Sequence, residues 1–294
     1  MKPPPFQYHD PKRVEEALEL LTNRENAKVL AGGQSLMAML NMRYVQPDHI
    51  VDINGIEDLS YIRSEDDTLH IGAMTRQREV EFSALIAERC PLMHEAILQV
   101  GHRQTRNRGT VGGSLCHLDP AAELPGVAMA LDATIEVQGP DGRRDVPMAE
   151  FPAFFMTPAI AANEIVTGLR FDVWPDGHGS AFIEFSRRHG DFAIVAVAAL
   201  LQSGSDGTIE RAAVTLSGTG PAPIRVAKAE ASLVGSDGAE DALLAAASAS
   251  AELEAIGDPH ASADYRRHLA KTLTLRALTS AYQRSTGAHG DRTH

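Results

Sequence analysis

Hydrophobic and polar positions alternate with two different periods in the first part of the chain. Val14, Ala17, Leu18 and Leu21 recur at helical spacing and predict an amphipathic helix over 14–21. Short apolar runs predict buried strands over 29–31 and 49–53, with a helix over 35–42 between them. The Asn54-Gly55 pair that follows is a strong turn signal. The pattern therefore predicts a first unit of strands and helices over about residues 1–54.

A second unit with the same mixture of periods follows, over about residues 55–176. Its predicted strands are 69–73, 134–137 and 165–171, its predicted helices are 75–85 and 91–100, and a further apolar segment covers 126–131. The segment from Trp174 to Gly179 is rich in proline and glycine, which is typical of a linker between domains.

The remainder of the chain reads as strands followed by helices. Strands are predicted over 180–187, 194–201 and 212–217, and alanine-rich helices over 223–233, 241–256 and 263–282. The polar residues 285–294 are expected to form a disordered tail. We therefore predict an α+β protein with one domain over 1–176 and a second over 177–284.

Composition narrows the class of protein. The chain has 294 residues and a formal net charge of −12, which argues against nucleic acid or an anionic membrane as a partner. Cys90 and Cys116 lack the spacing of a cluster or zinc ligand set, so no metal is expected on this chain. The N-terminus lacks an apolar signal region, and the longest apolar run, 192–201, is too short to span a bilayer. These features predict a cytoplasmic protein.

Two glycine pairs are the strongest indication of a ligand-binding site. Each pair, in 31–36 and in 110–115, is followed closely by a serine, and glycine lets an anion approach main-chain N–H groups. Two such loops predict a diphosphate held from two sides. Neither loop has the surroundings of a Rossmann or P-loop fingerprint. No pair of residues stands out as a catalytic acid and base, so we expect no catalytic residue on this chain.

At this point the sequence resembles a known family, the FAD-binding medium subunits of the molybdenum hydroxylases, which include carbon monoxide dehydrogenase and xanthine dehydrogenase. The resemblance covers nearly the whole chain. Besides the first glycine loop, it lies in the segments 106–113, 119–125, 187–195 and 263–269. Together these segments are highly specific.

The resemblance implies a fold and a role. The fold is a two-subdomain FAD-binding domain of PCMH type, followed by a C-terminal domain of a three-stranded antiparallel sheet with helices. The chain would hold FAD without a covalent bond, accept electrons from two [2Fe-2S] clusters of a small subunit, and pass them to an external acceptor. The molybdenum cofactor would lie on a large subunit, and the assembly would be a dimer of heterotrimers.

The resemblance also assigns cofactor-binding residues. The first pyrophosphate loop would comprise Val29, Leu30, Ala31, Gly32, Gly33, Gln34, Ser35 and Leu36, and the second Thr110, Val111, Gly112, Gly113 and Ser114. Ser114 replaces a more usual Asn, and Glu123 stands where relatives have an Asp that contacts the cofactor. Val100 would lie near the flavin or adenine, and Ile165 and Val166 would pack against the adenine. A lysine that some relatives have near Ile183 is missing. Phe192 would either cover the flavin ring or open a buried strand.

Two other functions stay open on the sequence alone. A stand-alone FAD-dependent oxidase would oxidise a small molecule directly, whereas a scaffold subunit would have lost FAD. The intact glycines favour a protein that binds FAD, because unused glycines only weaken local structure. Flavin content separates the scaffold from the other two, and turnover without partners identifies the oxidase.

Overall fold

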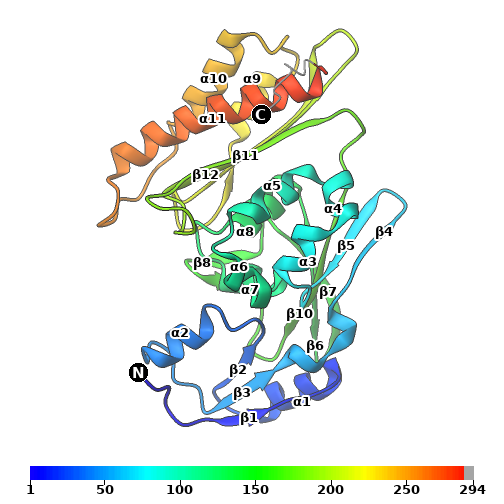
Figure 1. Cartoon of the computed structure of the whole chain (residues 1–294), viewed down its shortest axis with the longest axis vertical. Coiled ribbons are helices and arrows are strands. Elements are labelled where there is room, and N and C mark those ends of the chain that lie inside the picture. The colour runs from blue at the N-terminus through cyan, green and yellow to red at the C-terminus, as the bar shows by residue number, and fades with distance from the viewer. Residues whose placement is uncertain (288–294) are drawn as a thin grey trace.

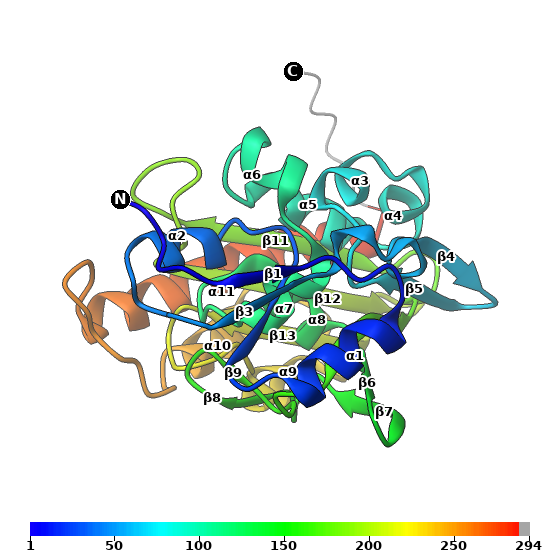
Figure 2. The ribbon, with the colours of Figure 1, turned by 90° about the horizontal axis from the view of Figure 1, so that it is seen from below.

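A computed structural model of the chain describes residues 1–287 and places three sheets one after another along its longest axis (Figure 1). The N-terminal sheet lies at one end, a five-stranded sheet with helices lies in the middle, and the C-terminal sheet with its helices lies at the other end. Seen along that axis, the N-terminal sheet covers the end of the middle part (Figure 2).

The N-terminal part is a small parallel sheet with the strand order β1-β3-β2. Parallel strands need crossover connections, and helices α1 and α2 are contained in them. The elements are β1 (Gln7–His9), α1 (Val14–Asn23), β2 (Ala27–Leu30), α2 (Leu36–Asn41) and β3 (His49–Asp52), followed by the short helices η1 (Ile53–Gly55) and η2 (Glu57–Leu59). The predicted helix 14–21 and the two predicted strands are confirmed within a few residues.

The middle part is an antiparallel sheet of order β4-β5-β10-β6-β7, with helices packed on it. Its strands are β4 (Ile62–Glu65), β5 (Thr68–Gly72), β6 (Thr134–Gly139), β7 (Gly142–Pro147) and β10 (Ile165–Asp172), with the hairpin β8 (Pro152–Phe154) and β9 (Thr157–Pro158) beside them. Its helices are α3 (Gln77–Phe82), α4 (Ala84–Arg89), α5 (Pro91–Gln99), α6 (Arg103–Arg108), α7 (Val111–His117) and α8 (Glu123–Ala130).

One predicted helix of this part, 75–85, is wrong as a single element. The chain forms α3 and α4 instead, with a break at Ser83. The Ser83 hydroxyl accepts the Ile86 N–H and so caps the second helix, while the Ser83 main chain is extended. A serine favours such a cap over a position inside a helix, which explains the break.

The C-terminal part is an antiparallel sheet of order β11-β12-β13-β14, covered on one face by helices. Its elements are β11 (Gly179–Phe185), β12 (Val195–Ser203), β13 (Ile209–Ser217), β14 (Ile224–Arg225), α9 (Ala227–Leu233), α10 (Glu240–Ser250) and α11 (Ala263–Ser285). The three predicted strands are present, and the two-residue β14 adds a fourth. Ile224 and Arg225 therefore do not open a helix as predicted, and α10 ends before 256 as well.

The predicted boundary of the disordered tail, residue 285, lies too early in the chain, because Ser285 still belongs to α11. The remainder of that expectation, 288–294, lies outside the described residues.

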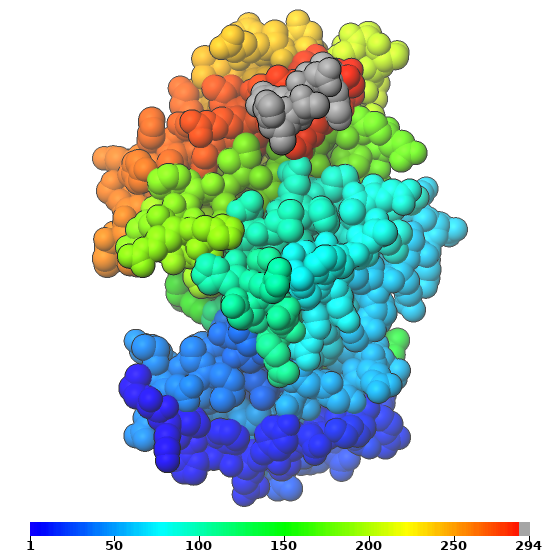
Figure 3. All heavy atoms as spheres, viewed as in Figure 1, coloured from blue at the N-terminus to red at the C-terminus, as the bar shows by residue number. Residues whose placement is uncertain are grey.

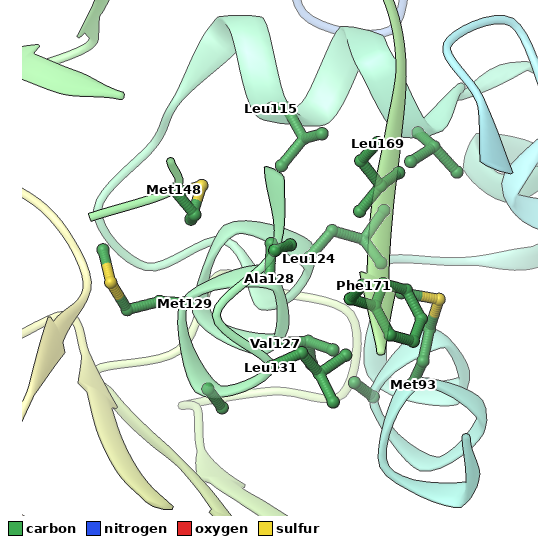
Figure 4. Packing of buried hydrophobic residues seen from close by; sticks show 14 of the residues in the cluster. Met93, Leu115, Leu124, Val127, Ala128, Met129, Leu131, Met148, Leu169 and Phe171 are labelled. Carbon is green, nitrogen blue, oxygen red and sulfur yellow. The ribbon is translucent and has the colours of Figure 1, made fainter. Parts of the chain in front are cut away.

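The strand β12 is buried on both faces. It takes part in the cores of both the middle and the C-terminal part and so joins them. Ala196, Ala198 and Leu200 belong to the core of the middle part, whereas their neighbours Val195 and Val197 belong to the core under the C-terminal helices. Figure 4 shows the middle core, where side chains of α8 pack beside Met93 of α5 and Phe171 of β10. A strand covered on both sides reads as a continuous apolar run, as 192–201 does.

The linker segment after β10 lies at this junction too. Trp174 is 3% exposed, and the Arg211 guanidinium of β13 lies 4.0 Å from the centre of its ring. Trp174 therefore packs between the middle and C-terminal parts.

Candidate functional site

The first glycine loop connects β2 to α2 and leaves main-chain donors free. Gly33 has a φ of +74°, a conformation that glycine adopts without strain. Within residues 1–287, the main-chain N–H groups of Gly33, Gln34 and Ser35 donate to no protein acceptor. Adjacent unpaired N–H groups in front of a helix form a site for an anion. This loop fits the predicted phosphate contact.

The second glycine pair differs from the open loop that the sequence predicts. Gly112 and Gly113 lie in the first turn of α7, and their N–H groups already have protein acceptors. Gly112 N–H donates to the Ala73 carbonyl over 2.8 Å, and Gly113 N–H donates to the Thr110 hydroxyl over 3.1 Å. Thr110 is thus the N-cap of α7.

The glycines of the second pair serve close packing. A Cβ on Gly112 would lie 2.5 Å from the Cβ of Ala73, and a Cβ on Gly113 would lie 2.6 Å from the Thr110 hydroxyl. A side chain at Gly112 would therefore clash with the main chain of Ala73, and one at Gly113 would displace the Thr110 hydroxyl that caps α7.

The fold brings the two loops together. A Cβ on Gly32 would lie 2.3 Å from the Arg108 carbonyl oxygen and 2.8 Å from the Gly109 Cα. A Cβ on Gly113 would lie 3.6 Å from the Cβ of Ala31. Residues about 80 positions apart are therefore in contact, as the two-loop hypothesis requires. In the space-filling view the surface is hollowed between the N-terminal part and the parts above it (Figure 3).

Arg76 and Asn54 link the two loops. Arg76 Nη1 donates to the Arg108 carbonyl over 2.6 Å, and Arg76 Nη2 donates to Asn54 Oδ1 over 2.7 Å. Asn54 Nδ2 in turn donates to the carbonyl of Ala31 over 2.7 Å. One continuous set of hydrogen bonds thus runs from the first loop to the residue before Gly109. Neither residue belongs to the site predicted from the sequence.

These links place positive charge beside the loops in an acidic chain. The side chain of Arg76 is partly buried, and burial, together with the nearby Arg108, lowers its pKa. Lys28, on β2, lies near enough to His117 to lower the pKa of that imidazole, to which burial contributes most. Two arginines and a lysine around the loops favour a polyanionic ligand despite the net charge of −12.

The other predicted contacts lie in two further places. Ile165 and Val166 are 3% and 4% exposed in β10, and the neighbouring Thr167 carbonyl accepts the Ala73 N–H beneath α7. Val100 is 8% exposed, and its carbonyl accepts Arg106 Nη1. These three side chains belong to the packed interior.

Phe192 does not open a buried strand, because it is 57% exposed and β12 begins at Val195. Its loop lies beside the segment after α5, since a Cβ on Gly190 would lie 2.4 Å from the His102 ring. An exposed aromatic ring on this loop is available to a ligand.

Glu123 begins α8 and is 4% exposed. Burial raises the pKa of its carboxyl to about 7. A second acidic side chain lies near it, that of Glu184 on β11, whose pKa burial raises to about 8 with a further contribution from Glu123. Glu184 was not among the predicted site residues, because an isolated glutamate on a strand carries no motif.

Cys116 and Arg266 have structural environments. Burial raises the pKa of the Cys116 thiol to about 12, so this thiol is held in its neutral form. Arg266 of α11 is 6% exposed. Its guanidinium donates to the carbonyls of Ile194 and Gly218 and pairs with Asp258, which holds the ends of β12 and β13 to α11.

Comparison with known proteins identifies the architecture. Residues 4–174 match the family described as FAD binding domain in molybdopterin dehydrogenase, and residues 180–281 match the CO dehydrogenase flavoprotein C-terminal domain. The chain belongs to the FAD-binding medium subunits of the molybdenum hydroxylases. The resemblance seen in the sequence is thereby confirmed, together with the fold class, the oxidoreductase class and FAD as the cofactor of this subunit.

Individual relatives agree along their whole length. The chain is 40% identical to the 6-hydroxypseudooxynicotine dehydrogenase complex subunit alpha of Paenarthrobacter nicotinovorans, covering 97% of each chain. It is 35% identical to the carbon monoxide dehydrogenase medium chain of Hydrogenophaga pseudoflava, covering 97% of this chain and 99% of that one. A solved structure of carbon monoxide dehydrogenase from the same organism superposes with a TM-score of 0.94, at 37% identity, over 97% of this chain and 99% of that chain.

Residues 1–287 contain neither a membrane-spanning helix nor a cluster of metal ligands. None of the helices in this range has the length and apolar character to cross a membrane. No group of three or more His, Cys, Asp or Glu side chains in this range is arranged to hold a metal ion.

Proposed function

We propose that this chain is the FAD-carrying electron-transfer subunit of a heteromeric molybdenum hydroxylase. It would receive electrons from [2Fe-2S] clusters of a small subunit and pass them to an external acceptor. A large subunit with the molybdenum cofactor would oxidise the substrate, and the complex would be a dimer of heterotrimers. The relatives named as medium chains and complex subunits support a heteromeric assembly.

One observation carries the proposal: the free N–H groups of Gly33, Gln34 and Ser35 lie on a loop that packs against the second glycine loop. We assign the diphosphate of FAD to these donors. Residues 29–36 would supply the direct contacts, and 110–114 would hold that loop in place through Gly113 and the turn around Thr110. Hydrogen bonds to an anionic group are stronger than those between neutral groups.

The remaining predicted residues would contact other parts of the cofactor. We assign Val100, Ile165 and Val166 to packing beneath it, Glu123 to a polar contact, and Phe192 to a face of the flavin ring. When bound, FAD supplies a redox centre that takes up and releases electrons singly or in pairs. This chain's residues bind and orient that group and limit its access to solvent.

The test is the visible absorption spectrum of the purified chain, followed by heat release of the chromophore. One FAD per chain, released without covalent attachment, is expected. If the chain lacks flavin, it is titrated with FAD and binding is followed by quenching of flavin fluorescence. Failure to bind added FAD, alone and with its partner subunits, would contradict the proposal and favour a scaffold subunit. Turnover of a small molecule without partner subunits would instead identify a stand-alone oxidase.

A further inference from the structure

The loop that presents Phe192 packs against His102, a residue of the middle part. This loop, residues 186–194, connects β11 to β12, and Phe192 in it is 57% exposed. A Cβ on Gly190 would lie 2.4 Å from Cε1, 2.8 Å from Nδ1 and 2.9 Å from Nε2 of His102. The His102 imidazole therefore lies directly against the Gly190 main chain, and the centre of its ring is 6.0 Å from that of His189.

Hydrogen bonds hold the loop to itself and not to the middle part. The Ile194 N–H closes its base by donating to the Phe185 carbonyl over 2.7 Å, and the Asp191 N–H donates to the Arg188 carbonyl over 3.1 Å. Among the hydrogen bonds and ion pairs of residues 1–287, none joins the loop tip, residues 187–192, to the middle part. Packing contacts, among them that of His102, therefore hold the loop tip in place.

A short helix connects His102 with the first glycine loop. His102 is the N-cap residue of α6, and the last residue of that helix, Arg108, has the carbonyl oxygen that a Cβ on Gly32 would meet at 2.3 Å. Arg106 of α6 is 9% exposed and donates to Glu81 over 2.8 Å, which fixes the helix to α3. A helix of six residues is about 9 Å long. The Gly190 contact and the free phosphate-binding donors thus lie towards the two ends of one firmly held element.

Gly190 makes the close approach to His102 feasible. Its φ of +86° lies in the left-handed region, where glycine is unstrained, and a side chain there would occupy the space of the His102 ring. The loop approaches the ring because residue 190 has no Cβ. Since Phe192 follows two residues later, the position of Gly190 on the ring determines where the phenyl group is held.

We propose that His102 is a positioning residue that holds the 186–194 loop, and with it Phe192, against the flavin ring of bound FAD. This inference rests on the proposed function, which assigns Phe192 to a face of the flavin. With the diphosphate at the first glycine loop, the ribityl chain can bridge the length of α6 to the loop at its other end. His102 contacts the loop and not the reacting atoms, so it acts on the cover of the flavin.

Trypsin measures the position of the loop without FAD, because Arg187 and Arg188 in the loop tip are exposed. In His102→Ala the loop tip loses a ring contact, so it is expected to open more often and to be cut about fivefold faster after these arginines. Mass spectrometry of the fragments identifies the cut. His102→Phe keeps a flat ring at this position and is expected to be cut within about twofold of the rate for the unaltered protein.

Gly190→Ala tests the same contact from the side of the loop. Its Cβ would meet the His102 ring at 2.4 Å, so the substitution is expected to speed the cut at least as much as His102→Ala does. In the presence of His102→Ala this clash is absent, and Gly190→Ala is expected to add less than it does alone. Gly207→Ala is the matched control, because Gly207 has a φ of +83° and its nearest neighbour, the Tyr282 hydroxyl, lies 3.5 Å from the Cβ position. It introduces similar strain without the clash and should leave the cut unchanged.

In the FAD-loaded protein, quenching of the flavin fluorescence by iodide reports how well the ring is covered. His102→Ala and Phe192→Ala are each expected to raise the quenching constant about twofold or more, because the loop opens or loses its ring. If His102 acts through Phe192, the double variant is quenched no more than Phe192→Ala alone. His260→Ala removes an exposed histidine of the C-terminal part and is expected to change neither the quenching nor the cut.

Two results overturn the proposal. Equal rates of the trypsin cut in His102→Ala and in the unaltered protein show that the ring does not hold the loop. A faster cut with unchanged iodide quenching shows that His102 has a structural role alone. A faster cut together with stronger quenching that depends on Phe192 supports the proposal. A chain that binds no FAD, alone or with its partner subunits, contradicts the proposed function instead, and the trypsin cut then still shows whether His102 holds the loop.

Discussion

At the scale of the residue, Gly33 is the most sensitive position of the first loop. Its φ of +74° strains any other residue, and a Cβ would lie 3.2 Å from the side chain of Met37. Valine is β-branched, so Gly33→Val should cost about 1–2 kcal/mol in backbone strain or force the loop to rearrange. We expect a loss of FAD affinity of at least tenfold, measured by titration, while the C-terminal domain stays folded.

Gly177 provides a matched control for this substitution. It has a φ of +83°, and no atom lies within 4 Å of the position of its Cβ. Gly177→Val therefore introduces similar strain away from the glycine loops, and FAD affinity should stay unchanged. Full retention of FAD by Gly33→Val would argue against the two-loop site.

The sequence identified these glycines but not their different roles. Glycine pairs are visible as a pattern, whereas the acceptors of their N–H groups are not. The Ala73 carbonyl that occupies Gly112 N–H comes from a strand end about forty residues earlier. The local pattern gave no sign of Glu184 or of the buried Arg266 for the same reason, because the surroundings of a charged side chain depend on tertiary contacts that local pattern does not contain.

At the scale of the element, the hydrogen bonds of Arg76 determine how the two loops are held together. Arg76→Gln removes the bonds to the Arg108 carbonyl and to Asn54. Since bonds to a charged donor contribute about 1.5–3 kcal/mol, FAD affinity should fall by about tenfold or more. Arg76→Lys keeps the charge but cannot reach both acceptors at once, so we expect an intermediate loss.

Arg89→Gln is the control for Arg76→Gln. Arg89 also donates to a main-chain carbonyl and to an acidic side chain, those of Asp66 and Asp67, but these lie in the turn between β4 and β5 and not in the glycine loops. Its FAD titration should match that of the unaltered protein. Equal affinities for Arg76→Gln and Arg89→Gln would show that Arg76 does not position the loops.

Helices and strands with a clear repeat of hydrophobic residues were predictable. Elements that form only through a cap or through packing against a neighbour were not. The strands 134–139 and 165–172 and the helix 91–99 follow their apolar pattern. Helix α7 begins with Val111-Gly112-Gly113, a sequence of low helix propensity, and it forms because Thr110 caps it and β5 packs against it. The two-residue β14 is too short to have a period at all.

At the scale of the whole molecule, the carboxyls of buried Glu123 and partly buried Glu184 make the stability of the FAD-free protein depend on pH. Burial raises the pKa of Glu123 to about 7 and that of Glu184 to about 8, against 4.5 for the same groups in an unfolded chain. Between these values the folded protein holds more protons than the unfolded one. The free energy of unfolding therefore falls as pH rises towards 8, by at most about 1.4 kcal/mol per pH unit for each proton.

The window from pH 7.5 to 8.5 isolates this effect. Burial lowers the pKa of His9, His117 and His178, so these side chains favour the folded state increasingly until the unfolded chain has lost the same protons, about one pH unit above 6.5. The two cysteine thiols have pKa values of about 12 in the fold against 9.0 in an unfolded chain, so they contribute little below about pH 8.5. Denaturant unfolding of the FAD-free chain should thus show a midpoint that decreases across the window. In Glu184→Gln, which cannot ionise, the decrease should be smaller, because one of the two protons is no longer lost. A midpoint that rises or stays constant in the unaltered protein would mean that the carboxyls are ionised in the fold, and hence that a donor within the chain already stabilises them.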